Sequence, residues 1–285
     1  MGYYEYLGKE VKVVIDRPIG SKHPDYELIY PINYGYIPDS KAGDGEEIDA
    51  YLVGIDEPLE KYCGIVKALV IREDDVENKL VVIPDHLEVD ERMIAEAIQF
   101  QESYFKTRII LNQKIIGNSL ILRPLNKVDP LMIQEAFADQ GWTKPASQYE
   151  QYLAWQEEGL RDIIVAQFNK EFAGYLTIQW QSENQTFANA KIPEIVDFNV
   201  LKKFQRKGIG SVLMDEAESR IGQVSEISGI GVGVTADYGP AHVLYIKRGY
   251  IPDGKGIKEN NKPLSFGDQI SIHDGIVIHL TKNLK

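Results

Sequence analysis

The sequence has one cysteine, no long apolar run and fewer basic than acidic residues. Cys63 is the only cysteine among 285 residues, which excludes an intramolecular disulfide and fits a reducing cytoplasm. No segment approaches the roughly 18 consecutive apolar residues that a membrane-spanning helix needs. The first residues, MGYYEYLGKE, lack the basic start and apolar run of a signal peptide. The net charge of −12 disfavours general nucleic-acid binding. We therefore expect a cytoplasmic protein that binds neither membranes nor nucleic acid.

The composition and its charge pattern predict two domains. Hydrophobic residues make up 44% of the chain and charged residues 26%, which is typical of globular proteins with buried cores. Residues 1–114 hold 13 Lys and Arg against 23 Asp and Glu, whereas residues 115–285 hold 18 against 20. The stretch LNQKIIGNS (111–119) is the expected junction, so we predict domains at 1–114 and 115–285.

The two halves differ in their expected elements. Short apolar runs in the first half predict strands at 11–15, 49–55, 64–72 and 79–84, followed by a helix at 89–106. Strands closed by one helix indicate an α+β domain or a small β-barrel. The second half predicts helices at 129–139 and 147–158, a helix after Gly208 and a short helix near Pro240. It also predicts strands at 163–168, 172–180, 194–200, 229–236 and 275–280.

Positive charge gathers at one expected helix start, within NVLKKFQRKGIGSVLMDEAESRI (199–221). The basic residues are Lys202, Lys203, Arg206 and Lys207. A helix N-terminus carries partial positive charge and unpaired backbone N–H groups, so it repels cations and favours an anion. Gly208 and Gly210 have no Cβ to obstruct a ligand. We therefore predict a phosphate-binding loop; a surface loop with solvated lysines is the alternative.

Two motifs in this half resemble the GNAT N-acetyltransferase superfamily. QRKGIG (205–210) matches its Q/R-x-x-G-x-G/A signature, and AHVLYIKRGY (241–250) is similar to its A-x-x-L-Y-x-x-x-G-F/Y segment. The resemblance implies a mixed sheet flanked by helices, with acetyl-CoA as cofactor and its pantetheine arm between strands 194–200 and 229–236. It carries cofactor contacts over to Asn199, Val200, Gln205, Arg206, Lys207, Gly208, Ile209, Gly210 and Asp237.

The same resemblance suggests the residues that transfer protons. Glu194 stands eleven residues before Gln205, the position of the base carboxylate in histone-acetylating relatives. Asp197 is the competing base, and strand alternation predicts that the two carboxylates face opposite sides of the sheet. Tyr245 matches the tyrosine that would protonate the departing coenzyme A thiolate. Trp142, Trp155 and Trp180 are interpreted as core residues rather than as the lining of an acceptor pocket.

The acidic half resembles soluble family I inorganic pyrophosphatases over roughly residues 8–108. DGEEID (44–49) stands where that family has D-G-D-P-x-D, and REDDVENKLVVIP (72–84) is similar to its second acidic segment. The resemblance implies a Mg²⁺ site whose carboxylate oxygens are the hard ligands that this cation prefers. Its ligands would be Asp44, Asp49, Asp74 and Glu77. Phosphate contacts would come from Lys22, Lys79 and Tyr104, with Lys106 displaced by one position, and Glu46 would activate water.

The sequence departs from the pyrophosphatase pattern at several points. Glu47 replaces the signature proline, Glu46 and Glu77 have longer arms than aspartate, and a hairpin with a phosphate-binding arginine is absent. A displacement of about 1 Å can reduce a rate by about 10²-fold. The leading hypothesis is therefore acetyl transfer from acetyl-CoA to a primary amine, on a small molecule or a peptide. The alternatives are Mg²⁺-dependent hydrolysis of pyrophosphate and a pyrophosphate-binding or purely structural first domain; a homodimer is left open.

Overall fold

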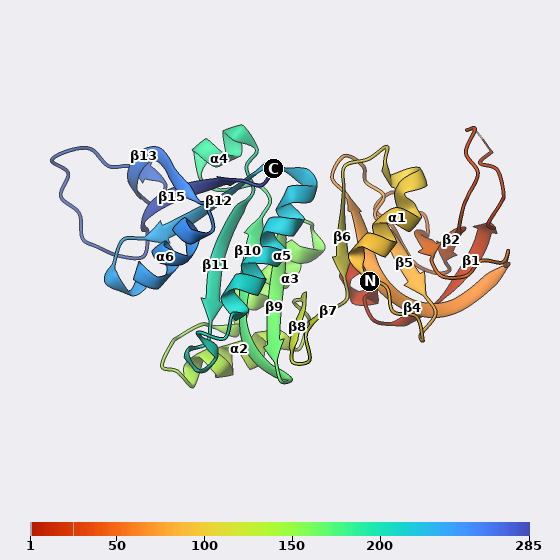
Figure 1. Ribbon diagram of the computed structural model, residues 1–285, viewed down its shortest axis with the longest axis horizontal. Helices are drawn as coiled ribbons and strands as arrows, with labels where there is room; N and C mark the ends of the chain where they lie inside the picture. Colours follow the sequence, from red (N-terminus) through yellow and green to blue (C-terminus); the bar gives the residue numbers. More distant parts are fainter. Residues whose placement is uncertain (1, 25) are drawn as a thin grey trace.

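The computed structural model describes residues 2–24 and 26–285 and contains two β-sheets, one in each half of the chain (Figure 1). The first half contains η1 (Tyr3–Tyr6), β1 (Glu10–Arg17), β2 (Asn33–Ile37), β3 (Ile48–Leu52), β4 (Lys61–Arg72), β5 (Lys79–Ile83), α1 (Glu91–Glu102) and β6 (Thr107–Leu111).

The first sheet closes into a five-stranded barrel. Its strand order is β1-β2-β3-β5-β4-β6, and β1 also pairs with β4, so the sheet joins its own edge and β6 extends from β4. A Cβ at Gly35 on β2 would lie 1.9 Å from the Val14 carbonyl oxygen on β1, so only glycine allows this approach. The predicted small barrel is confirmed, although the sequence pattern missed β2 and β6.

The barrel half has two apolar clusters, one on each face of its wall. The first contains Val13, Ile48, Leu52, Leu69 and Leu80, and η1 packs against it. The second contains aromatic side chains of β2 and β3 together with Ile94 and Ile98 of α1. The helix covers Glu91–Glu102 and is therefore shorter than the predicted 89–106. It begins after Asp90 because the Asp90 side chain caps it, accepting from the Met93 N–H at 2.8 Å.

The second half forms a nine-stranded mixed sheet with helices on both faces. Its elements are β7 (Lys114–Ile116), β8 (Leu120–Pro124), α2 (Asp129–Ala138), α3 (Ala146–Glu157), β9 (Arg161–Phe168), β10 (Glu171–Gln179), α4 (Gln185–Ala190), β11 (Glu194–Val200), η2 (Lys202–Phe204), α5 (Ile209–Val224), β12 (Ile227–Gly233), η3 (Ala236–Tyr238), α6 (Gly239–Lys247), β13 (Ile251–Glu259), β14 (Lys262–Pro263) and β15 (Ile276–Asn283). The strand order is β14-β13-β15-β12-β11-β10-β9-β8-β7, and β11–β12 is the parallel pair.

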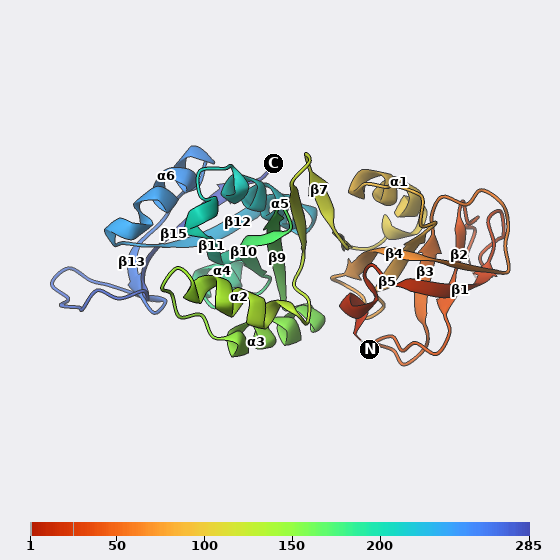
Figure 2. The same ribbon diagram turned by 90° about the horizontal axis from the view of Figure 1, so that it is seen from below.

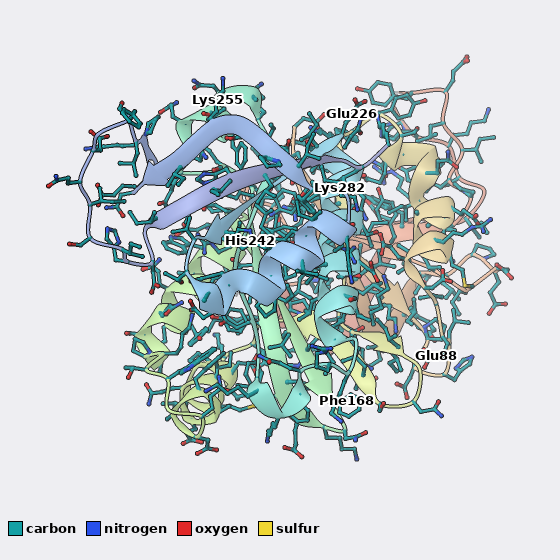
Figure 3. All side chains as sticks on the ribbon, turned by 60° about the vertical axis from the view of Figure 1, so that its left-hand side comes forward. Glu88, Phe168, Glu226, His242, Lys255 and Lys282 are labelled. Carbon is teal, nitrogen blue, oxygen red and sulfur yellow. The ribbon has the colours of Figure 1, made fainter. Side chains whose placement is uncertain are left out.

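The helices form two layers around this sheet. Figure 2 shows α2 and α3 on one side of it and α5 and α6 on the other. The helix predicted after Gly208 is α5, and its apolar side chains Ile209, Leu213, Ala217 and Ile221, at spacings of four, are buried in the core of this half. Figure 3 shows α6, with His242, in front of the sheet, and the chain between β13 and β15 projecting beyond it. The elements α4, β13 and β14 were not predicted.

The two halves meet at a buried carboxylate. Asp162 on β9 is 1% exposed and accepts from Arg108 on β6 at 2.8 Å and from Arg220 on α5 at 3.0 Å. Arg108 also stacks on the Trp180 ring, whose N–H donates to Asp162 at 3.0 Å. Although burial alone raises it, the two guanidinium groups hold the pKa of Asp162 below its usual value. The Ile109 N–H of β6 donates to the Gln223 side chain of α5 at 3.2 Å and adds to this joint. None of the helices in the described ranges is long and apolar enough to cross a membrane.

Candidate functional site

Strands β11 and β12 separate soon after they begin, and this opens a gap in the second sheet. Their parallel pairing joins Glu194 to Gly229 and Ile195 to Ile230, whereas β11 continues to Val200 and β12 to Gly233. On its other side β11 stays paired with β10 as far as Val200. The backbone edge of residues 196–200 that faces β12 is therefore free of strand partners, at the place where the sequence predicted a cofactor arm.

The glycine loop leads from this gap into α5. Gly208 is the N-cap with φ +81°, a left-handed conformation that favours glycine, and no side chain caps the helix. The Val212 N–H reaches the Gly208 carbonyl at 3.1 Å, so the amides of residues 209–211 precede the intrahelical hydrogen bonds. An uncapped helix N-terminus of this kind is a binding site for an anion.

The four basic residues before α5 are exposed but not equivalent. Lys203 pairs with Glu171 at 2.7 Å, and Lys202 lies over the Trp142 ring. Arg206 and Lys207 have no carboxylate partner within the described ranges, and Arg206 has φ +63°. Lys207 in turn lies over the Phe168 ring. Within the described ranges Lys203 is thus the one member of the cluster that a carboxylate pairs, and Arg206 and Lys207 are the two basic residues nearest the start of α5.

The remaining predicted cofactor contacts have internal roles as well. The Gln205 side chain folds back and donates to the Val200 carbonyl at 3.1 Å, and the Asn199 amide donates to Asp197 at 2.9 Å. Asp237 is exposed on η3 and accepts a hydrogen bond from the Thr235 hydroxyl. Gly210 lies in the first turn of α5, where an added Cβ would stand 3.2 Å from the Phe198 ring.

A β-bulge interrupts β11 between the two candidate bases. Val196 pairs with Thr177 and Asn199 with Tyr175, so Asp197 and Phe198 together stand opposite one residue of β10. Asp197 takes φ +48°, which is uncommon for a residue with a side chain. The bulge turns its carboxylate toward α3, where it accepts from Tyr152 at 2.9 Å and from Tyr175 at 2.6 Å.

Glu194 lies on this same face of the sheet. It is in register with Gln179, which is in register with Arg161, and directly opposed residues of neighbouring strands share a face. Arg161 stacks on Tyr152 and Trp155 of α3. The prediction that Glu194 and Asp197 face opposite sides is therefore wrong, because the bulge breaks the alternation between them.

The two carboxylates have different surroundings. In addition to the two tyrosines, Asp197 accepts from Gln148 at 2.9 Å and forms an ion pair with Lys144 at 2.7 Å. Its oxygens are thus occupied by donors from the protein. Glu194 is 6% exposed and accepts a hydrogen bond from Ser182. Burial raises the pKa of Glu194, while the Ser182 hydrogen bond opposes this shift.

His279 on β15 completes the environment of Glu194, and no motif in the sequence points to this histidine. Its Nε2 lies 3.5 Å from Glu194 Oε1, and its ring packs edge-on against Phe187 of α4. Burial, together with Lys258, lowers the pKa of His279 to about 4, so the ring is neutral at pH 7. A neutral imidazole at this distance places no positive charge beside Glu194.

Tyr245 lies on α6 and is 5% exposed. Burial raises the pKa of its phenol above 10, and the nearby Tyr238 adds to this shift. The phenol is therefore protonated at neutral pH and can donate a hydrogen bond. The same shift makes it a weaker acid than the sequence argument assumed.

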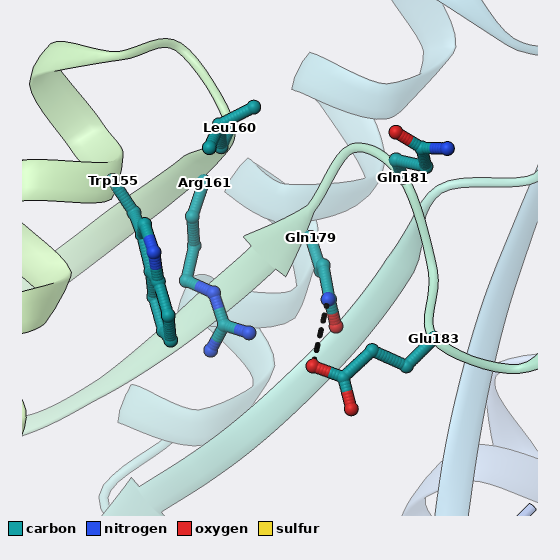
Figure 4. A pocket seen from close by; sticks show the side chains of 6 residues that line it. All are labelled: Trp155, Leu160, Arg161, Gln179, Gln181 and Glu183. Atoms are coloured by element: carbon teal, nitrogen blue, oxygen red, sulfur yellow. Dashed lines mark hydrogen bonds between the residues drawn. The ribbon is translucent and has the colours of Figure 1, made fainter.

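A cavity of about 230 Å³ lies on the α3 face beside this row of residues. Its lining comes from α3, the start of β9, the end of β10 and the loop that follows, as Figure 4 shows. Trp155 packs against the apolar core of this half, as interpreted from the sequence, and it also lines the cavity. Arg161 also lines the cavity and is 7% exposed; sequence analysis missed it because a single arginine at a strand start carries no motif.

The four predicted Mg²⁺ ligands of the barrel half do not gather. No group of three or more His, Cys, Asp and Glu suited to a metal occurs among residues 2–24 and 26–285. Asp49 pairs with Lys79 at 2.5 Å and also accepts from Tyr34, and Glu77 pairs with Lys79 at 3.3 Å. Asp44 accepts from the Glu46 N–H at 3.0 Å and Asp74 from the Lys106 N–H at 3.0 Å. Cations and amides of the protein engage these carboxylates, and the Mg²⁺ site stays a prediction.

The predicted phosphate contacts are equally dispersed. Lys79 is 1% exposed, and its ammonium is held by Asp49, Glu77 and the Tyr34 hydroxyl. Lys22 is exposed on an isolated bridge with Ile29, and Tyr104 is 77% exposed beyond the end of α1. Glu46, the expected water-activating residue, is also exposed. The three phosphate contacts therefore share no common environment.

Comparison with known proteins concerns the second half of the chain. Residues 130–250 match the family model described as Acetyltransferase (GNAT) family, and no curated protein matches the chain. A putative GNAT acetyltransferase from Desulfovibrio desulfuricans is 14% identical, with 59% of this chain and 100% of that chain covered at a TM-score of 0.45. YncA, a putative acetyltransferase from Salmonella typhimurium solved with its cofactor acetyl-CoA, is 16% identical, with 59% and 95% covered at a TM-score of 0.44. An N-acetyltransferase from Staphylococcus aureus is 14% identical, with 59% and 100% covered at a TM-score of 0.45.

The matched region contains both motifs, the glycine loop, the bulge and the gap between β11 and β12, and it stops short of the barrel. Residues 130–250 of this chain are thus similar to the GNAT acetyltransferases, as the motifs at 205–210 and 241–250 indicate.

Proposed function

We propose that the second half of the chain is an acetyl-CoA-dependent N-acetyltransferase that acts on a primary amine. The observation that carries this proposal is the gap between β11 and β12 that runs into an uncapped helix N-terminus. The amides of residues 209–211, with Arg206 and Lys207 beside them, suit a pyrophosphate, and the free edge of residues 196–200 suits an amide-bearing arm. Acetyl-CoA supplies an acetyl thioester whose acetyl group passes to the amine nitrogen as the thiol departs.

Glu194 is the better candidate base. It must remove a proton from an ammonium or from the attacking amine, and burial raises its pKa toward the range where a carboxylate serves this purpose at neutral pH. Asp197 has its oxygens occupied by Lys144, Gln148 and two tyrosines, so we assign it the role of holding α3 and the α2–α3 loop against β11. Tyr245 would hydrogen-bond the leaving sulfur as a protonated phenol.

The barrel half supports a different proposal. The pairing of Lys79 with Asp49 and Glu77 favours a structural role over pyrophosphate hydrolysis, since the groups that would bind metal and phosphate neutralise each other. We keep the predicted division at 114/115 as a proposal. The change of sheet lies just before it, because β6 ends the first sheet at Leu111 and β7 begins the second at Lys114.

Calorimetric titration of the full chain with acetyl-CoA tests the proposed function. We expect wild type to bind, and Gly210→Glu to lose at least 100-fold in affinity, because a carboxylate would stand where the pyrophosphate binds. The new Cβ meets Phe198, so thermal unfolding must accompany the titration. Arg206→Gln combined with Lys207→Gln gives a second reading that leaves the backbone unchanged. Equal affinity in wild type and Gly210→Glu would overturn the proposal.

A further inference from the structure

Arg161 is a buried cation without a carboxylate partner. It is 7% exposed, and its guanidinium makes one hydrogen bond within the described ranges, a long one of 3.4 Å to the Thr177 hydroxyl. No Asp or Glu oxygen of those ranges lies within the 4.0 Å ion-pair distance. Every other arginine that is equally buried, namely Arg72, Arg108 and Arg220, has at least one carboxylate. Burying a charge without a partner is costly, so the position requires a reason.

The surrounding side chains hold the Arg161 guanidinium in place but leave most of its N–H donors without an acceptor. The guanidinium carbon lies 4.9 Å from the centre of the Tyr152 ring and 4.8 Å from that of the Trp155 ring. Cation–π contacts of this kind stabilise the charge but use none of its N–H donors. In Figure 4 the guanidinium stands beside Trp155, facing the side of the cavity where Gln179 and Glu183 lie. A planar fork with unused donors is suited to a carboxylate, which it binds through two parallel hydrogen bonds.

The other charges beside the cavity restrict which charged molecules can bind there. Glu183 is exposed on the cavity wall, where it accepts from Gln179 at 3.4 Å, and Glu194 lies in the next register position along the row. A purely anionic ligand would be repelled by these two carboxylates, and a polyamine would be repelled by Arg161. A molecule with one carboxylate and one ammonium satisfies both signs.

The size and position of the cavity agree with such a ligand. A volume of about 230 Å³ is below the roughly 300–1,000 Å³ of pockets for drug-sized molecules, so it suits a small metabolite. Neighbouring strand positions are about 4.5–5.5 Å apart, so the backbones of Arg161 and Glu194, with Gln179 between them, are about 9–11 Å apart. Both side chains lie on the same face of the sheet, so one small molecule can lie between the guanidinium and the carboxylate.

We propose that the acceptor is a free amino acid, whose carboxylate binds Arg161 and whose amine is directed toward Glu194. This inference rests on the proposed acetyltransferase function and names its substrate class. Arg161 is then a specificity-determining residue that binds the acceptor and takes no part in proton transfer.

The test compares acceptors with and without the carboxylate. The full chain, saturated with acetyl-CoA, is assayed for thiol release with each L-amino acid and with its primary amide, in wild type, Arg161→Gln and Arg161→Lys. We expect at least one free amino acid to be used with kcat/KM at least tenfold above its amide. Arg161→Gln should lower kcat/KM for the amino acid at least tenfold and leave that for the amide unchanged; Arg161→Lys should lie between, since it keeps the charge and loses the fork.

Three further readings separate the possible failures. If acetyl-CoA does not bind in calorimetry, the proposed function falls. If acetyl-CoA binds but no free amino acid is acetylated, or the amides serve equally well, only the present inference is wrong. Thermal unfolding of Arg161→Gln should change by less than about 3 °C, because no ion pair is lost. A large fall would show that the arginine is structural and would also overturn the inference.

Discussion

The two halves of this protein differ in whether the polar groups of their predicted sites are already hydrogen-bonded or ion-paired within the protein. In the barrel half, the carboxylates that resemble metal ligands are paired with Lys79 or with backbone amides of the same half. In the second half, the amides at the start of α5, the edge of β11 beyond Ile195 and the Arg161 guanidinium have unused hydrogen-bonding capacity. A matching motif indicates a binding site only when the fold leaves its groups unsatisfied.

The two sheets also differ in whether their strand edges are paired. The barrel closes because β1 pairs on both sides, whereas the second sheet has a gap between the two strands of its parallel pair. Closure removes the edges to which a ligand backbone can bind, and the gap exposes one. We therefore propose that the second half binds ligands and that the first supports it structurally, and the following measurements test this difference.

The largest effect is expected where the two halves meet. Asp162→Ala would leave Arg108 and Arg220 buried without their shared carboxylate, and we expect a loss of about 3–5 kcal/mol in the free energy of unfolding. Urea denaturation measures it. Glu96→Ala is the control, because its ion pair with Arg92 is exposed and should change stability by less than about 0.5 kcal/mol. A loss below about 1 kcal/mol for Asp162→Ala would mean that the joint does not couple the halves.

The next effect concerns catalysis in the second half. Glu194→Gln should lower the rate of acetyl transfer by about 10²-fold or more at neutral pH. Because the base must be deprotonated, the wild-type rate should fall as pH drops through the raised pKa of Glu194, and in the glutamine variant the rate should recover as rising pH neutralises the amine.

Ser182→Ala is the matched variant for this pH profile. It removes the hydrogen bond that holds down the pKa of Glu194, so the acidic limb of the profile should move to higher pH with the maximum rate largely retained. A Glu194→Gln enzyme within threefold of wild type at every pH would exclude Glu194 as the base.

A smaller effect is expected in the barrel. Asp49→Asn would leave the buried Lys79 ammonium with a weaker partner, and we expect a loss of about 1–3 kcal/mol in stability. Asp44→Asn, at an exposed position, should cost less than about 0.5 kcal/mol. Neither variant should alter a Mg²⁺ titration followed by thermal unfolding. If Mg²⁺ raises the wild-type midpoint by several degrees and Asp49→Asn abolishes this, the barrel is a metal site after all.

The smallest effect separates the exposed cations before α5. Neutralising Arg206 and Lys207 together should weaken acetyl-CoA binding about 3- to 10-fold at low salt, and less at high salt because exposed charges are screened. Lys203→Gln should leave the affinity unchanged, since Lys203 is paired with Glu171. Equal effects of all three changes would indicate a diffuse attraction rather than a defined site.

Local signals explain what could be predicted from the sequence. The bounds of β11 at 194–200 and the start of α5 after Gly208 agree with the prediction, because an apolar strand, two glycines and an amphipathic helix are all encoded within a short stretch. The barrel was also predicted, from the succession of short strands. By contrast, β13 contains Pro252, Gly254 and Gly256, which normally mark turns, and so it was missed.

The rest depends on contacts between distant residues. The bulge at Asp197 needs a left-handed aspartate that only the packing of β10 and α3 can hold, and alternation alone gave the wrong face. The pairing of Asp49 with Lys79 joins residues 30 positions apart, so the motif could not show that its carboxylate was occupied. Arg161 is significant because it lacks a carboxylate partner, and no local sequence pattern can reveal that.

The joint at Asp162 has a consequence for how the two halves of the chain depend on each other. Asp162 and Arg161 are neighbours on β9, one held by Arg108 of the barrel and the other lining the cavity. Deletion of the barrel would remove Arg108, which contacts Asp162 on β9, the strand that also carries Arg161. A change in the barrel half that moves Arg108 can therefore act on the cavity arginine, which is one residue away from Asp162 on β9.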